Sequence, residues 1–302
     1  MAASMWCRTL TRRQIPTLFG LGPHGECSFI NPVALRLLGG ERAEDFLGRP
    51  VLELIAPAEG AGQKLHDALR LAQSLHADDL AFRRMDGSLF HAEVHLDPIG
   101  DDGAGGAVVN FVDITRRKAA EAAVWHQANH DALTGLANRN LFRAHLDQAV
   151  AQARRGGETV ALLFVDLDGF KAINDGHGHA VGDRVLRETA RRLERAIRES
   201  DLAARLAGDE FVVILRHLAG EAYAGAVAAK LIAALAEPCR FGKQALAVTA
   251  SIGIALYPQD AANAEELLHH ADAAMYKAKE AGRRTYRYYA GGRFAASWSP
   301  AT

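Results

Sequence analysis

The stretch VALLFVDLD at residues 160–168 decides the fold of the larger part of this chain. An unbroken apolar run that ends in two acids separated by a leucine is typical of a strand buried on both faces. Side chains alternate along a strand, so Asp166 and Asp168 point the same way at its carboxyl end, where open α/β sheets bind ligands. Two carboxylates placed there repel each other unless a cation lies between them. The pair therefore indicates either a site for a hard cation such as Mg²⁺ or two solvated loop acids.

A second source of carboxylates lies in RLAGDEF at residues 205–211, which is followed by the apolar run VVIL. Residues 203–206 and 211–215 predict the two strands of a hairpin, with its turn at residues 207–210. Gly208 has no side chain and lets a ligand approach the backbone closely, although an ordinary Gly-Asp turn has the same pattern. If this hairpin pairs beside residues 160–165, Asp209 or Glu210 meets Asp166.

Several further segments share their order and spacing with one known family. They are DALTGLANR (131–139), FVDLDGFKAINDGHGHAVGD (164–183), TASIGIALYP (249–258) and ADAAMYKAKEAGRR (271–284). With RLAGDEF, they make residues 131–290 resemble the GGDEF domain of diguanylate cyclases. The resemblance implies a palm-like sheet with a ferredoxin-like βαββαβ core. It also implies an enzyme, a nucleotidyltransferase that condenses two GTP molecules into cyclic di-GMP and releases pyrophosphate.

The resemblance also assigns roles to individual residues. It implies that Asp166, the backbone carbonyl of Leu167 and Asp209 bind Mg²⁺ or Mn²⁺, and that Asp209 and Glu210 are catalytic. The implied GTP-binding residues are Gly169, Phe170, Lys171, Asn174, Asp183, Gly208, Lys279 and Arg283. Asn174 and Asp183 match the family's guanine readers: a carboxylate accepts from guanine N1–H and N2–H₂, and an amide donates to O6. Lys279 and Arg283, four residues apart in an expected helix, would face one triphosphate.

Two further positions bear on regulation and on activity. Arg198 and Asp201 form an RxxD that precedes the AGDEF hairpin, as in family members with an inhibitory product site. The alternative is a surface ion pair at a helix end. Ala207 stands where the family usually has glycine, and its methyl group would weaken activity if the backbone there needs a positive φ. A catalytically weak or inactive receptor for cyclic di-GMP or GTP therefore stays as the alternative function.

Residues 15–115 show short apolar strands and short helices separated by glycine and proline, which predicts an α+β domain. FINPVALRLLG (29–39), FRRMDGSLFHAEV (82–94) and the closing DIT (113–115) resemble a PAS sensory domain, which implies a five-stranded antiparallel sheet with helices. His66 and His76 fall on or just after the helix expected at residues 61–76, where some haem-binding relatives place an axial ligand. A lone histidine on a helix is more often a plain surface residue. The PAS ligand therefore stays unknown.

Residues 116–130 contain neither proline nor glycine and predict a helical signalling linker between the two domains. Ile114, Glu121 and Ala128 recur every seven residues, which makes a short, polar coiled-coil seam with a single solvated helix as the alternative. In the family, each GGDEF domain holds one GTP, so the resemblance implies a homodimer for catalysis. Residues 1–14 and 291–302 are expected to form an N-terminal extension and a C-terminal tail.

Composition sets the remaining limits. The chain has 302 residues, 49% hydrophobic and 24% charged, which suits about two globular domains. A formal net charge of −1 without a clustered basic face argues against a nucleic-acid partner. No apolar run is long enough for a membrane span, and three widely spaced cysteines suit a reducing compartment, so we expect a cytoplasmic protein.

Overall fold

The computed structural model describes residues 17–50, 61–99, 106–218, 220–241 and 244–289. The chain divides into two compact units, Met1–Ala123 and Val124–Thr302. The predicted extension at 1–14 and tail at 291–302 lie outside the described residues. No helix among the described residues is long and apolar enough to cross a membrane.

The first unit is built on a five-stranded antiparallel sheet of order β2-β1-β5-β4-β3. Its strands are β1 (Thr17–Leu21), β2 (Cys27–Ile30), β3 (Leu75–Arg83), β4 (Leu89–Pro98) and β5 (Ala107–Asp113), and its helices are α1 (Pro32–Leu37), the 3₁₀ turn η2 (Ala43–Asp45) and α2 (Ala61–Arg70). Helix α1 begins at Asn31, whose side chain accepts a hydrogen bond from the Ala34 N–H. Phe82 lies fully buried between Phe90 and Phe111, with ring centroids 5.4 and 5.2 Å away.

The expected helix at 61–76 is shorter in the structure, because α2 ends at Arg70 and His76 lies on strand β3. The backbone reverses at Ala72, which has a left-handed φ of 49°, and Leu75 and His76 then pair with β4. The prediction that His76 lies on or just after the helix, where an axial haem ligand would sit, was therefore wrong. The side chain of His66 lies outside what the structure describes.

The linker helix predicted at 116–130 is present as α3 (Thr115–Asn129). Ile114, which opened the expected heptad seam, precedes this helix and is buried, with only 4% of its surface exposed. None of the side chains of α3 is buried. The helix therefore exists in the expected place, and the seam loses its first apolar position.

The second unit holds a five-stranded sheet of order β12-β11-β6-β8-β7, with β12 parallel to β11 and the other pairs antiparallel. Its elements are α4 (Arg139–Gly156), β6 (Val160–Asp168), α5 (Phe170–His177), α6 (His179–Ala196), β7 (Leu202–Ala207), β8 (Glu210–Leu215), α7 (Glu221–Ala236), β9 (Cys239–Phe241), β10 (Gln244–Leu246), β11 (Thr249–Tyr257), α8 (Ala264–Glu280) and β12 (Tyr286–Tyr288). The run β6-α6-β7-β8-α7-β11, with central strand order β11-β6-β8-β7, is the predicted ferredoxin-like βαββαβ core.

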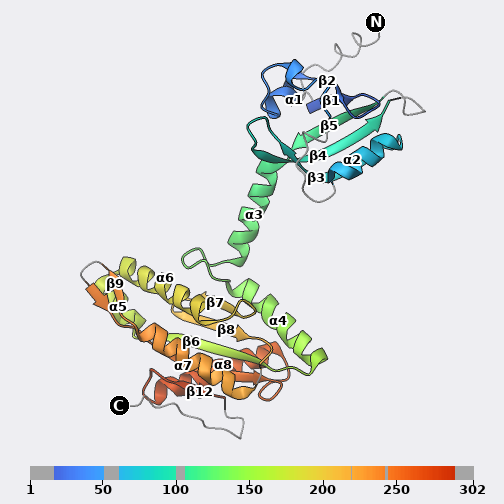
Figure 1. Cartoon of the computed structure of the whole chain (residues 1–302). Helices are drawn as coiled ribbons and strands as arrows, with labels where there is room; N and C mark the ends of the chain where they lie inside the picture. The colour runs from blue at the N-terminus through green and yellow to red at the C-terminus, as the bar shows by residue number, and fades with distance from the viewer. Residues whose placement is uncertain (1–16, 51–60, 100–105, 219, 242–243, 290–302) are drawn as a thin grey trace. The chain divides into compact units, whose positions relative to one another are not determined.

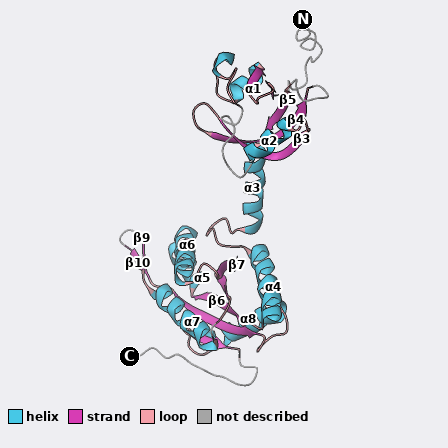
Figure 2. Ribbon diagram, turned by 45° about the vertical axis from the view of Figure 1, so that its right-hand side comes forward, coloured by secondary structure: helices cyan, strands magenta, loops and turns pink. Residues whose placement is uncertain are grey.

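Helices cover both faces of this sheet, as Figure 2 shows with α6 and α7 on one side and α4 and α8 on the other. Strand β6 is buried along almost its whole length and divides its side chains between two cores. Leu163 and Val165 pack into the core with α6 and α7, whereas Leu162 and Phe164 pack into the core with α4 and α8. By the same alternation, Asp166 points toward the α4 and α8 side.

Candidate functional site

Strand pairing brings the acids of the two motifs together. In the register of β6 with β8, Asp166 is directly opposite Glu210, so their side chains share one face of the sheet. The turn between β7 and β8 folds back onto β6, where the Leu167 N–H donates to the Asp209 carbonyl oxygen across 3.4 Å. The prediction that the hairpin pairs beside β6 and brings these acids together is confirmed.

Burial and neighbouring charges shift the acids of this cluster away from their usual behaviour. Burial raises the pKa of Asp166 above its usual value, the Lys279 ammonium acts against the rise, and the Asp209 and Asp168 carboxylates add to it. Burial also raises the pKa of Glu210, with Asp166 the strongest of the neighbouring charges. Negative charge is therefore concentrated at the paired ends of β6 and β8.

Lys279 supplies the direct positive partner of this cluster. Its Nζ lies 2.8 Å from Oδ2 of Asp166, and the two side chains are 29% and 10% exposed. Helix α8 positions the lysine by packing its apolar face, including Ala271 and Met275, on β6 and β11. The sequence predicted both residues at the site, but the contact between them follows only from the structure.

Asp168 fits neither interpretation that the sequence left open for it, because protein donors hold both of its carboxylate oxygens. Its Oδ1 accepts from the Ser251 hydroxyl and its Oδ2 from the Thr249 hydroxyl, each at 2.7 Å. The backbone N–H of Arg284 also donates to Oδ2 across 3.2 Å. Hydroxyl and backbone donors on β11 and after α8 therefore satisfy Asp168, and its task is to tie these segments to the end of β6.

Lys279 and Arg283 do not share a helix, because α8 ends at Glu280. The Arg283 N–H donates to the Ala278 carbonyl across 3.2 Å and the Gly282 N–H to that of Lys279 across 3.4 Å, which is a Schellman motif. Gly282 has a φ of 107°, and Arg283 follows with a left-handed φ of 60°. The exposed Arg283 side chain is therefore placed by a chain reversal instead of by helical spacing.

The polar residues expected to read a base lie on α5 and α6, which follow β6. Gly169 starts α5 with a φ of 73°, Phe170 is buried, and Lys171 is exposed. Gly182 lies so close to Asn174 that a Cβ on it would be 1.9 Å from the Asn174 Oδ1. The missing side chain at Gly182 lets the Asn174 amide lie beside the residue that precedes Asp183.

Arg205 is a residue of the site that sequence reasoning missed. Its Nε and Nη2 donate to the carbonyl of Gly208 at 3.0 and 2.8 Å, and its Nη1 lies 2.9 Å from Oδ1 of Asp131. Burial acts to raise the pKa of Asp131, but hydrogen bonds from Thr134 and Arg205 outweigh it, and the pKa lies below its usual value. Arg205 therefore joins the turn that carries Asp209 to the segment before α4. Its place at the head of RLAGDEF was the available signal.

The backbone at Ala207 is not strained, because this residue does not adopt the positive φ considered for its position. It is the last residue of β7 and pairs with Glu210, whereas the left-handed conformation falls on Gly208, with a φ of 50°. Alanine therefore fits the backbone, and its effect is limited to the space taken by one exposed methyl group.

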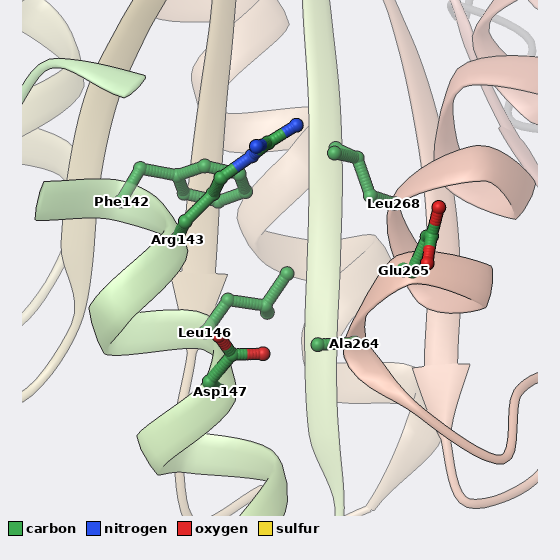
Figure 3. A pocket seen from close by; sticks show the side chains of 7 residues that line it. All are labelled: Phe142, Arg143, Leu146, Asp147, Ala264, Glu265 and Leu268. Atoms are coloured by element: carbon green, nitrogen blue, oxygen red, sulfur yellow. The ribbon is translucent and has the colours of Figure 1, made fainter. Parts of the chain in front are cut away.

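A hollow of about 270 Å³ lies between α4 and α8, on the same side of the sheet as Asp166. Figure 3 shows Phe142, Arg143, Leu146 and Asp147 on one wall and Ala264, Glu265 and Leu268 on the other. Two further residues near the site come from these helices, because Arg139 lowers and Asp272 raises the pKa of Glu210. The acidic cluster therefore has charged neighbours on both α4 and α8, although none of its acids lines the hollow itself.

Arg198 and Asp201 lie after the end of α6. They do not form the ion pair that was the alternative interpretation, because the Asp201 carboxylate accepts from the backbone N–H groups of Arg198 and Arg216 at 3.1 and 3.2 Å. The Arg198 guanidinium lies 4.4 Å from the centroid of the Tyr223 ring. Arg198 lines two hollows of about 280 and 320 Å³, so its side chain borders open space on the α6 side of the sheet.

Comparisons with known proteins agree with this geometry. Residues 128–285 match the family model described as "Diguanylate cyclase, GGDEF domain", and residues 16–116 match a PAS domain model. An uncharacterized signaling protein of Caulobacter vibrioides is 39% identical over 81% of this chain, which covers 31% of that protein. Diguanylate cyclase TpbB of Pseudomonas aeruginosa is 46% identical over 57% of this chain, which covers 40% of TpbB. The chain thus spans less than half the length of either relative.

A solved structure of the GGDEF domain of TpbB (YfiN) matches with a TM-score of 0.52 and 46% sequence identity, covering 53% of this chain and 94% of that one. This match and the family models agree with the strand order and with the predicted succession of domains. The chain belongs to the GGDEF domain family, and a PAS domain precedes its GGDEF domain.

Proposed function

We propose that this chain is a diguanylate cyclase, which condenses two GTP molecules into cyclic di-GMP and releases two pyrophosphates. One observation carries the proposal: Asp166, Asp209 and Glu210 gather at the paired ends of β6 and β8, beside the Lys279 ammonium. Such a cluster suits phosphoryl transfer, in which catalysis depends on positioning and on the neutralisation of phosphate charge. Residues 131–290 form the cyclase domain in this proposal, and residues 15–115 the sensor.

The residues present fit a divalent metal ion. Burial raises the pKa of Asp166 and the neighbouring carboxylates add to the rise, so a bound cation would favour the charged form of this cluster. Asp166, the Leu167 carbonyl and Asp209 would hold Mg²⁺ or Mn²⁺, since hard oxygen donors suit these ions. When bound, such an ion polarises the α-phosphate and offsets charge on the departing pyrophosphate.

The remaining residues of the site bind and orient the nucleotide. Lys279 lies where its ammonium can contact both Asp166 and a phosphate, and Lys171 and Arg283 present exposed cations to the same anion. Gly169 and Gly208 leave the backbone accessible to the triphosphate, and the buried Phe170 anchors the start of α5 beside Gly169. Asn174 and Asp183 read the guanine edge, and an adenine would leave a buried acceptor unpaired at a cost of about 1–3 kcal/mol.

Glu210 accepts the proton of the ribose 3′-hydroxyl in this proposal. Burial and the neighbouring acids raise the pKa of Glu210, and the raised pKa makes its carboxylate a stronger base. Its register position opposite Asp166 places it beside the residues assigned to the metal and the α-phosphate. Glu210 thus acts next to the reacting atoms.

Each GGDEF domain holds one GTP, so the reaction needs two chains whose sites face each other. Holding both reactants in line can supply about 7–11 kcal/mol of the barrier. A signal from the PAS domain that alters the facing of two cyclase domains would therefore change the rate strongly. Arg198 and Asp201 bind the product at the α6 side, where the Arg198 fork can reach guanine O6 and N7 or a phosphate.

The experiment is incubation of the pure chain with GTP and Mg²⁺, followed by chromatographic detection of cyclic di-GMP. Asp209→Ala should abolish product and keep the circular dichroism spectrum and melting temperature of the wild type. Glu237→Ala, which removes an exposed acid after the end of α7, is the matched control and should retain turnover. A wild-type chain that binds cyclic di-GMP but never forms it from GTP would overturn the proposal in favour of a receptor.

A further inference from the structure

A second cluster of metal-binding side chains lies in the first unit, away from the acids of the GGDEF domain. His76, Glu93 and His95 each offer one ligand atom, and these atoms all lie within 4.8 Å of one another. His76 on β3 is directly opposite His95 on β4 in the antiparallel register. Glu93 lies two residues before His95, so the sheet places all three side chains on the same face.

The alternation of β4 shows that this face is turned to solvent. Ala92, Val94 and Leu96 are fully buried in the core of the PAS domain, whereas Glu93 is half-buried and His95 is exposed. The three ligand residues are therefore not needed to fill the core. An ion from solution has direct access to them, and their substitution leaves the core intact.

The details of the cluster favour a metal over a chance meeting of polar groups. The rings of His76 and His95 lie with centroids 4.1 Å apart, an arrangement in which both nitrogens can turn toward one ion. Asp78 Oδ1 lies 2.7 Å from Nε2 of His76. A carboxylate on one imidazole nitrogen orients the ring and leaves the other nitrogen for the metal, which is the usual outer partner of a metal-binding histidine.

We propose that His76, Glu93 and His95 form a binding site for a divalent transition-metal ion of the zinc class on the PAS sheet. Two imidazoles and one carboxylate are a donor set that Zn²⁺ takes up with an open fourth position, whereas Mg²⁺ and Ca²⁺ prefer all-oxygen ligands. Tetrahedral Zn²⁺ with bonds of about 2.0–2.1 Å needs ligand atoms about 3.3–3.5 Å apart. The ligand atoms lie within 4.8 Å of one another, so they need to move by about 1.5 Å at most to reach that spacing.

The site adjoins the first turn of α3. Glu93 Oε2 lies 3.5 Å from Nη2 of Arg117, and the Nε of the same arginine lies 3.9 Å from Oε1 of Glu121 on the same helix. A metal bound through Glu93 competes with Arg117 for that carboxylate. Binding of the ion and the contact between β4 and α3 are therefore linked, and each weakens the other by the same factor.

The test is isothermal titration calorimetry, in which Zn²⁺ is added to the metal-free full chain. The buffer contains excess Mg²⁺ to occupy the metal site proposed at Asp166 and Asp209 in the GGDEF domain. The wild type should bind one Zn²⁺ tightly at this site. His76→Ala, His95→Ala and Glu93→Gln should each weaken that binding by about tenfold to a hundredfold, the effect expected for loss of a metal ligand or its support. His24→Ala, an exposed histidine in the β1–β2 turn, is the matched control and should change nothing.

A second set of variants separates this site from another histidine pair. His126 and His130 stack with centroids 4.3 Å apart and are the strongest competing position among the described residues. If His130→Ala abolishes the binding and His95→Ala does not, the proposal is overturned. Arg117→Ala should tighten Zn²⁺ binding by about twofold to fivefold by freeing Glu93. Unchanged affinity in that variant would refute the link to α3.

Discussion

The contact between Arg205 and Asp131 yields the sharpest test of how this fold places its acids. Arg205 anchors the carbonyl of Gly208, the residue before Asp209, and ties it to the segment before α4. We expect Arg205→Ala to lower both the stability of the second unit and its turnover of GTP. The substitution touches none of the residues assigned to the metal or the base.

The loss of stability expected for Arg205→Ala depends on how exposed the groups in contact with Arg205 are. A hydrogen bond to a charged group contributes about 1.5–3 kcal/mol net. Water can replace the guanidinium at Gly208, which is exposed, so the main loss is the ion pair, whose side chains are 12% and 25% exposed. We expect the free energy of unfolding to fall by about 2 kcal/mol, which lowers the melting temperature by about 4–8 °C in a unit of this size.

Turnover should fall further than stability, because the turn loses its anchor. A displacement of about 1 Å at a reacting group can reduce the rate about a hundredfold, so we expect kcat to fall between tenfold and a hundredfold. The assay is cyclic di-GMP formation at saturating GTP, alongside thermal unfolding of Arg205→Ala, Arg205→Lys, Asp131→Asn and the Arg205→Lys, Asp131→Asn double variant. Lysine keeps the charge but has no fork, so it should recover stability only in part.

The double-mutant cycle decides whether the reasoning holds. Asp131 and Arg205 are in contact, so their effects on unfolding should be coupled by about 1 kcal/mol or more. Strictly additive effects, or an Arg205→Ala chain with full stability and full turnover, would refute the view that this pair positions the catalytic turn.

Three other substitutions, and the pH dependence of Asp131→Asn, test separate features. Asp168→Asn turns an amide toward the donors of Thr249 and Ser251, so it should lower the free energy of unfolding by about 2–3 kcal/mol in thermal melts, as a structural residue would. Arg198→Ala should leave the initial rate unchanged and remove inhibition by added cyclic di-GMP in progress curves. Ala207→Gly should lower KM for GTP without raising the melting temperature, because Ala207 has no left-handed strain to relieve. The depressed pKa of Asp131 stabilises the folded state above the unfolded pKa of about 3.9 and ceases to do so as the pH falls through the folded pKa. Asp131→Asn should therefore flatten the acid limb of stability measured against pH.

Local sequence was sufficient for much of the fold. The buried strand β6, the β7–β8 hairpin and the meeting of Asp166 with Glu210 follow from apolar runs, a glycine turn and strand alternation, all within about fifty residues. The linker helix followed from composition alone. These features depend on short-range patterns, which a sequence displays directly.

The predictions that differ from the structure involve either partners that are distant in the chain or a break in a periodic pattern. Asp168 is satisfied by hydroxyls more than eighty residues away, at Thr249 and Ser251, which no local spacing shows. Arg283 continued a helical spacing from Lys279, but Gly282 ended the helix first. His76 was placed at the end of a helix because the reversal at Ala72 is made by an alanine instead of the usual glycine.

Helix α3 has no buried side chains, which limits how much the rest of the fold stabilises its helical form. Ion pairs of Arg117 with Glu93 and of Lys118 with Asp79 hold its first turns, and the rest of this fifteen-residue segment depends largely on propensity, which leaves it near its helix–coil midpoint in water. Val124 and Trp125 are 67% and 57% exposed, so a neighbouring surface that covered them would tip that balance toward the helix. The segment between the PAS and GGDEF domains can thus change its rigidity at little energetic cost, and we expect an added protease to cut within it in dilute solution.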